Sequence, residues 1–175
     1  DMNNWETIKL GKILTSLNNK SIFQNQFPVL TSSRSGLFLQ SEYFKKIVAS
    51  KDNTGYKVLE RGQFTYRTMS DDGFFKFNQL KNLSKGLISP AYEVFEVDKN
   101  LANPNFIEYL LNSEIIYSQI YFSAQGGTRL ALRFASLEKL KLKLPPLAEQ
   151  NKIVEILSAF QRLIDLIDKK ISKEK

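Results

Sequence analysis

This chain of 175 residues contains no cysteine and no histidine. Without cysteine it can form neither a disulfide framework nor a thiolate metal site. Without histidine it lacks the commonest general base and metal ligand, which excludes every Ser–His or Cys–His catalytic arrangement. No apolar run approaches the roughly 20 residues that a helix needs to span a bilayer. We therefore expect no membrane partner and a cytoplasmic location.

Motifs for other kinds of chemistry are also missing. The pair Gly126-Gly127 is not followed by the Lys-Ser/Thr of a phosphate-binding loop. The segment Asp71-Asp72-Gly73 is typical of a turn, and Glu93 and Glu96 would point to opposite faces of a strand. Nothing supplies a tuned acid or base beside these carboxylates. We expect no catalytic residue, no bound metal and no cofactor in this chain.

Positive charge is present, and it is unevenly distributed. Residues 1–146 hold 19 Lys and Arg against 13 Asp and Glu, a net charge of +6. Residues 147–175 hold 6 against 5, a net charge of +1. A basic domain suggests a polyanionic partner, although many soluble proteins are mildly basic without one.

Many short strand-like runs with a few helices predict an α+β domain over residues 1–146. Residues 56–59 and 64–67 look like strands on either side of a hairpin-type break at 60–63. Residues 91–97 alternate apolar with polar side chains, which indicates a half-buried strand. Residues 139–144 alternate lysine with leucine, which predicts a strand with a basic outer face.

Other patterns predict one more strand and further helices in the domain. Val29-Leu30 begins a strand that should end in a polar loop over Thr31–Gly36, and residues 42–49 could form a short helix. Asn103-Pro104 is a good helix start, with Asn as the N-cap and Pro at the first helical position. The apolar residues Ile115, Ile116, Ile120 and Tyr121 either continue this helix or form a second one after Ser113.

The C-terminal segment, residues 147–175, predicts a long helix that leaves the domain. Pro145-Pro146 marks its start, because two prolines are tolerated at a helix beginning and not inside one. At 1.5 Å per residue, Leu147–Ser172 would be about 39 Å long. Apolar residues in it follow a heptad spacing: Ile153, Leu157, Phe160, Ile164, Ile167 and Ile171. The stripe could pack back on its own domain, but the length favours pairing with another helix.

Contacts to nucleic acid could come from several polar segments. Arg and Gln can read purine edges, while Ser, Thr and backbone N–H groups bind phosphates. Each segment could instead be an ordinary solvated loop, and the two lysines could merely aid solubility. The candidate residues are Ser32, Ser33 and Arg34, then Tyr66, Arg67 and Thr68, then Lys81 and Lys85, and finally Gln125, Gly126, Gly127, Thr128 and Arg129.

An ordered set of segments carries a family resemblance over nearly the whole chain. They are Trp5-Glu6 with Ile8-Lys9-Leu10-Gly11, Tyr56-Lys57-Val58 with Gly62-Gln63-Phe64-Thr65-Tyr66, Gly86-Leu87-Ile88-Ser89-Pro90-Ala91-Tyr92, Gly126-Gly127-Thr128-Arg129, and Leu144-Pro145-Pro146-Leu147-Ala148-Glu149-Gln150 with Ile153-Val154. In this order they resemble a target recognition domain and the helix after it in the specificity subunit of type I restriction–modification systems.

The resemblance implies a non-catalytic, sequence-specific DNA-binding subunit. Such a domain reads one half of a bipartite double-stranded DNA target, and its helix acts as a spacer that pairs with a second helix. The resemblance further implies partner methylase subunits, which bind S-adenosylmethionine and methylate adenine, and motor–nuclease subunits, which cleave.

One departure from the family pattern concerns the number of domains. Such subunits usually carry two recognition domains and two spacer helices, and this chain has one of each, as a fragment or a half-length subunit would. Self-association through the heptad helix would restore two recognition domains and make the DNA target symmetric. The alternative is a coiled-coil protein-interaction adaptor that does not bind DNA.

Overall fold

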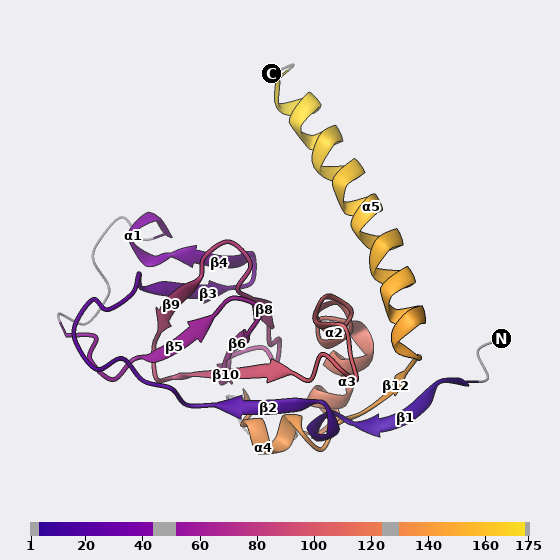
Figure 1. Ribbon diagram of the computed structural model, residues 1–175, viewed down its shortest axis with the longest axis horizontal. Helices are drawn as coiled ribbons and strands as arrows, with labels where there is room; N and C mark the ends of the chain where they lie inside the picture. The colour runs from indigo at the N-terminus through magenta and orange to yellow at the C-terminus, as the bar shows by residue number, and fades with distance from the viewer. Residues whose placement is uncertain (1–3, 44–51, 124–129, 174–175) are drawn as a thin grey trace.

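A computed structural model describes residues 4–43, 52–123 and 130–173, and its fold is α+β, as predicted. Short strands dominate the globular part, and a long helix leaves it at the C-terminus (Figure 1). In chain order the elements are β1 (Glu6–Lys9), a 3₁₀ turn (Leu10–Lys12), β2 (Leu14–Leu17), β3 (Leu30–Ser33), β4 (Gly36–Leu39), α1 (Gln40–Tyr43), β5 (Lys57–Glu60), β6 (Phe64–Arg67), β7 (Met69–Ser70), β8 (Asn78–Gln79), β9 (Lys85–Ile88), β10 (Tyr92–Val97), α2 (Pro104–Leu111), α3 (Glu114–Ser123), β11 (Leu130–Ala131), α4 (Phe134–Leu137), β12 (Lys141–Leu144) and α5 (Leu147–Lys173).

The central sheet is antiparallel and has the order β2-β10-β6-β8. Strand β10 was predicted as half-buried, and its position between β2 and β6 makes it more buried than that. Val94 and Phe95 are adjacent and both fully buried, so they point to opposite faces of the sheet. Val94 belongs to one hydrophobic cluster and Phe95 to the other. The sheet therefore has apolar packing on both faces.

The larger cluster holds an aromatic centre that the helices α2, α3 and α4 help to enclose. Phe64 of β6 stacks on Phe95 of β10, with ring centroids 5.2 Å apart. Tyr66 and Phe77 lie 4.9 Å apart in the same centre. The smaller cluster lies on the other face, and its buried members are Leu30, Leu59, Leu80, Ile88 and Val94.

The predicted pairing of the runs 56–59 and 64–67 is wrong. The chain does turn between them, where Gly62 takes a positive φ of 89°. However, β5 pairs with β9, and β6 pairs with β10 and β8. The physical reason is that both edges of β6 are occupied, one by β10, where Phe64 stacks on Phe95, and the other by β8, so no edge is left for β5.

The polar segment Thr31–Gly36 is more ordered than predicted. Strand β3 continues to Ser33 and pairs with β4, so only Arg34 and Ser35 form the hairpin turn. The buried side chain of Asn78 explains the extension, because its Nδ2 donates to Ser32 Oγ and to the Ser33 carbonyl, both at 2.8 Å. The helix predicted over 42–49 is observed as α1 up to Tyr43, and its remainder lies outside the described residues.

Two local predictions are confirmed, and the choice between one helix and two around Ser113 is decided in favour of two. Asn103 caps α2 by accepting from the amides of Asn105 and Phe106, with Pro104 as the first helical residue. Helix α3 begins directly after Ser113. Strand β12 pairs with β1, and its lysines are exposed while its leucines are buried.

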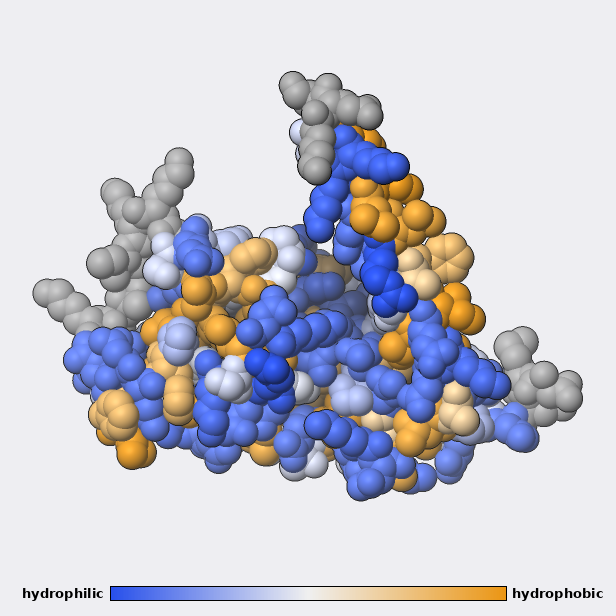
Figure 2. Space-filling model, turned by 45° about the horizontal axis from the view of Figure 1, so that its top comes forward, coloured by the Kyte–Doolittle hydropathy of each residue, from blue (hydrophilic) through white to orange (hydrophobic). Residues whose placement is uncertain are grey.

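Helix α5 begins at Leu147, as predicted, and rises away from the domain (Figure 1). Its first two turns pack on the domain, where Val154 is buried and Ile153 contacts the larger cluster. Beyond Ser158 every described side chain is exposed. Figure 2 shows hydrophobic residues running along one side of this projecting part and hydrophilic ones beside them.

Candidate nucleic-acid interface

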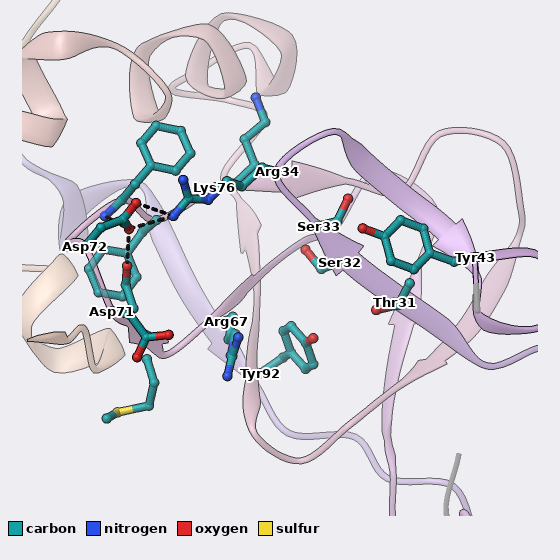
Figure 3. A pocket seen from close by; sticks show the side chains of 14 residues that line it. Thr31, Ser32, Ser33, Arg34, Tyr43, Arg67, Asp71, Asp72, Lys76 and Tyr92 are labelled. Carbon is teal, nitrogen blue, oxygen red and sulfur yellow. Dashed lines mark hydrogen bonds and ion pairs between the residues drawn. The ribbon is translucent and has the colours of Figure 1, made fainter. Parts of the chain in front are cut away.

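A cleft of about 530 Å³ lies where the β3–β4 turn faces the segment after β6. Three cationic side chains line it: Arg34 from the β3–β4 turn, Arg67 from the end of β6, and Lys76 (Figure 3). The structure thus brings together two of the segments that the sequence proposed for DNA contact. The full lining is Thr31, Ser32, Ser33, Arg34, Tyr43, Arg67, Met69, Ser70, Asp71, Asp72, Phe74, Phe75, Lys76 and Tyr92.

Arg34 is held by a carboxylate 38 residues away in the sequence. Its Nη2 donates to both oxygens of Asp72, at 2.6 and 2.5 Å. Its guanidinium carbon lies 5.1 Å from the centre of the Phe74 ring, which is a cation–π distance. The bond from Arg34, with further bonds from the Phe74 amide and the Ser70 hydroxyl, lowers the pKa of Asp72 to about 2. Asp72 therefore stays ionised at any physiological pH.

Arg67 and Lys76 differ from Arg34 in having no partner among the described residues. Arg67 is exposed and Lys76 is half-buried, and both face the same cleft. Thr68 lies beside Arg67, and its hydroxyl donates to the Ala91 carbonyl at 3.0 Å. The cleft carries three cations against the carboxylates of Asp71 and Asp72, and the two cations that no described carboxylate binds suit an anionic ligand.

Tyr66 cannot serve as a DNA contact in this conformation. Its side chain is 0 % exposed and forms part of the aromatic centre with Phe77 and Phe95. Its hydroxyl has no hydrogen-bond partner among the described residues, and burial, with a smaller contribution from Glu93, raises the pKa of that hydroxyl well above its ordinary value. The residue was chosen as part of the segment Tyr66-Arg67-Thr68, but β6 turns it inward and its neighbour Arg67 outward.

Lys81 and Lys85 lie outside the cleft and are both paired with carboxylates. The ammonium of Lys81 contacts Glu108, and that of Lys85 lies 2.6 Å from Glu60 Oε1 and over the ring of Phe27. A role of either lysine in DNA binding stays a prediction. The loop residues Gln125, Gly126, Gly127, Thr128 and Arg129 lie outside the described residues.

The joint between domain and helix α5 contains a buried polar residue whose structural role the sequence did not reveal. Gln150 is 0 % exposed. Its Oε1 accepts from the Asn103 amide at 2.8 Å, and its Nε2 donates to the carbonyls of Pro145 at 2.8 Å and Leu101 at 3.4 Å. Nearby, the indole of Trp5 donates to Glu149 Oε1 at 3.1 Å. In the sequence, the run Pro145-Pro146-Leu147-Ala148-Glu149-Gln150 marked the boundary between domain and helix, but it did not show which contacts hold the helix in place.

The six heptad residues divide at this joint. Ile153 and Leu157 are half-buried near the domain, while the four residues beyond them are between 48 % and 61 % exposed: Phe160, Ile164, Ile167 and Ile171. Ile156, Leu163 and Leu166 are exposed as well. The helix does not pack back on its own domain, so the first of the two alternatives for this stripe is excluded in this structure.

The described ranges contain neither a metal-binding cluster of carboxylates nor a membrane-spanning helix. No cluster of three or more Asp and Glu side chains in residues 4–43, 52–123 and 130–173 has the proximity needed to hold a metal ion. Over those same ranges, no helix combines the length and the apolar character needed to cross a bilayer.

Comparison with known proteins identifies the family. The family described as "Type I restriction modification DNA specificity domain" matches residues 2–174. The chain belongs to this family. It is 25 % identical over 173 residues to the type I restriction enzyme HindI specificity subunit of Haemophilus influenzae, covering 94 % of this chain and 37 % of that protein.

Solved structures of specificity subunits share the fold. The crystal structure of the HsdS subunit from Thermoanaerobacter tengcongensis superposes with a TM-score of 0.67 at 20 % identity, over 94 % of this chain and 44 % of that one. A chain from a structure of type I R-M complex assembly and conformational transition gives 0.61 at 16 % identity, over 95 % and 40 %. The chain thus spans less than half the length of these relatives and corresponds to one recognition domain with its helix.

Proposed function

We propose that this chain reads one half of a bipartite double-stranded DNA target for a type I restriction–modification enzyme. The observation that carries the proposal is the cleft in which Arg34, Arg67 and Lys76 meet, in a chain that belongs to the specificity family. Arginines can contact base edges, while lysines and backbone amides fix the protein on the phosphates. The net charge of +7 on the chain favours the approach of DNA.

In this proposal the chain itself carries out no chemistry. Partner methylase subunits, with S-adenosylmethionine bound to them, methylate adenine at the target, and motor–nuclease subunits cleave unmodified DNA. The chain determines which DNA sequence is bound, and its helix α5 extends from the domain as a rigid arm. A methyl-transfer assay with this chain alone should remain at background and should rise only when the methylase subunit is added.

Helix α5 supplies the arm, and it pairs with a second helix through the exposed seam Phe160–Ile171. A water-exposed seam is unfavourable by about 25 cal/mol for each Å² of apolar area, which a partner helix would remove. A second copy of this chain would supply such a helix and a second recognition domain. A relative with a similar fold comes from a structure of type I R-M complex assembly.

A gel-shift titration of duplex DNA at 50 mM and 200 mM salt tests the DNA-reading proposal. Each phosphate contact would lower the affinity roughly 3.5-fold between these two salt concentrations, so the measured loss reports how many such contacts form. Arg67→Ala should weaken binding at both, while Arg61→Ala, an exposed arginine that lies outside the cleft, should leave it unchanged. If no duplex shifts at either salt concentration, with or without the methylase subunit, the protein is an adaptor and the proposal is wrong.

A further inference from the structure

Strands β1 and β12 form a two-stranded ribbon at the foot of helix α5 (Figure 1). On its inward side, Ile8, Leu142 and Leu144 belong to the larger hydrophobic cluster, and this burial fixes the register because a slip by one residue would turn them outward. The alternate side chains are exposed and form what we call the lysine face. Its members are Thr7, Lys9, Lys141 and Lys143.

Two lysines of this face occupy directly opposed positions, Lys9 on β1 and Lys141 on β12. The backbone N–H of Lys141 donates to Gln119 Oε1 of α3 at 3.1 Å, and its carbonyl accepts from Gln119 Nε2 at 2.7 Å. Because both backbone groups point away from β1, this is a non-hydrogen-bonded pair, in which opposed side chains are closest. Like charges directly opposite each other destabilise a sheet. The two lysines therefore repel each other across the ribbon.

The charges of the lysine face form a row that no described carboxylate neutralises. The strand rise places Lys143 about 7 Å beyond Lys141 on the same side of β12. Lys139, which precedes β12, is exposed and likewise unpaired among the described residues. By contrast, the ammonium of Lys57 lies 3.1 Å from Glu93 Oε2. An anion bound to the lysine face would offset the repulsion between its members.

Protection of an open sheet edge does not account for this arrangement. A lysine on an edge strand discourages pairing with another chain, and Lys9 on β1 would be enough for that purpose. The other edge of the ribbon is already closed at Lys141, where Gln119 binds both backbone groups. A second lysine directly opposite the first adds repulsion without protecting a further edge. An anionic ligand explains the pair better.

We propose that the lysine face is a second DNA-contact surface, which binds the phosphate backbone. The inference rests on the proposed DNA-reading function and adds a surface to it, because none of the four residues lines the cleft. Lysine and threonine are among the side chains that bind phosphates. The face carries no Arg, Asn or Gln side chain that would read a base edge. Its contribution to DNA binding is therefore independent of sequence.

An acidic protein fits the lysine face less well than a phosphate backbone does. Protein interfaces depend on enclosed aromatic or other large anchors at their centre, and the lysine face has no apolar member. The exposed Phe122 lies beside it, in an open groove of about 510 Å³ that also contains Lys139 and Lys141. The row of charges continues beyond this groove to Lys143 and Lys9, which matches an extended polyanion.

Gel-shift titrations of the full chain in complex with its methylase subunit test this inference. Two probes are compared at 50 mM and 200 mM salt: a duplex that the wild type selects from a randomised library, and an unselected duplex. Combining Lys141→Gln with Lys143→Gln removes two phosphate contacts, so the fall in affinity between these salt concentrations should be about 12-fold smaller than for the wild type. The affinities for both duplexes should decrease by the same factor, because phosphates carry no sequence information.

The matched control combines Lys20→Gln with Lys99→Gln, which removes two charges from exposed positions outside the cleft and the lysine face. It should leave the salt dependence unchanged. Thermal unfolding of the Lys141 and Lys143 variant should not begin below that of the wild type, since an opposed charge is removed. An unchanged salt dependence in that variant, an equal change in the control, a loss confined to the selected duplex, or weaker sedimentation with the methylase subunit in the absence of DNA overturns the inference alone. Failure of the wild type to shift any duplex overturns the proposed function as well.

Discussion

The two parts of helix α5 carry the same apolar periodicity and have opposite surroundings. Near the domain, the heptad residue Ile153 packs against the larger cluster and Gln150 is completely enclosed; farther out, the heptad residues Ile164 and Ile167 are about half exposed. The same heptad pattern therefore serves two purposes, as domain core at one end and as an open seam at the other. Polar contacts fix the first turns of α5, because the side-chain amide of Gln150 makes three hydrogen bonds to the loops beneath the helix.

This comparison shows how the orientation of the arm is set. A helix anchored only by apolar side chains could rotate or slide, whereas an enclosed amide with directional partners allows one arrangement. The Asn103 side chain adds to this anchor, because its Oδ1 caps α2 while its Nδ2 donates to Asn151 Oδ1 at 2.7 Å. Helices α2 and α5 are thus fixed to each other, and the outer seam is held at a defined angle to the domain.

The largest effect is expected from removing the anchor. Gln150→Leu fills a similar space but leaves the Asn103 amide and the Pro145 and Leu101 carbonyls without their partner. Buried groups that lose their hydrogen bonds are costly, so the free energy of unfolding should fall by about 3 kcal/mol. Urea denaturation followed by circular dichroism measures it.

The outer part of the same helix offers the control for this variant. Gln161 is exposed, and its Nε2 donates only to Asp165 within α5, at 2.9 Å. Gln161→Leu should change the free energy of unfolding by less than about 0.5 kcal/mol. Equal effects of the two substitutions would show that the base of α5 is not distinguished by its buried amide.

A smaller effect, on association alone, is expected in the seam. Ile164→Ser removes an exposed apolar side chain that a partner helix would bury, and it should weaken self-association by about 2 kcal/mol, or roughly 30-fold. Unfolding of the domain should be unaffected. Sedimentation over a range of micromolar concentrations measures the association constant.

Arg162→Ser is the matched change on the other side of the helix. At 100° per residue, Arg162 lies opposite Phe160 and therefore away from the seam. It should leave the association constant unchanged. A wild-type chain that sediments only as a monomer throughout this range would contradict self-association and leave a helix from another chain or domain as the partner.

The structure also shows which kinds of feature could be predicted from the sequence. The cap at Asn103, the alternation in β12 and the start of α5 were predicted correctly, because each is marked by a pattern of residues that are neighbours in the chain. The pairing of β5 and β6 was not, because two strands from distant parts of the chain, β10 and β8, occupy both edges of β6. Local patterns carry no information about which distant strand supplies the better partner.

The candidate site shows the same limit. Arg34 and Arg67 were chosen from the sequence, and both line the cleft. Asp72 was interpreted only as a turn residue, because its contact with Arg34 joins two loops whose meeting depends on the whole sheet. Tyr66 was chosen together with its neighbours and proved to be buried. Alternation along β6 decides which face of the strand its side chain points to, and the sequence alone did not show which alternate residues point inward.

The smallest effect is expected at the rim of the joint. Glu149 lies in the first turn of α5, where a negative charge is favourable near the positive end of the helix dipole, and it accepts a bond from Trp5. Glu149→Gln keeps an acceptor oxygen and removes the charge, so the free energy of unfolding should fall by only about 0.5 kcal/mol. Trp5 is the single tryptophan, and its fluorescence reports directly on this contact. A loss of unfolding free energy as large as that of Gln150→Leu would show that the Trp5–Glu149 contact, and not the enclosed amide of Gln150, is the main anchor of α5. A small loss would confirm that α5 is held mainly by the enclosed amide of Gln150.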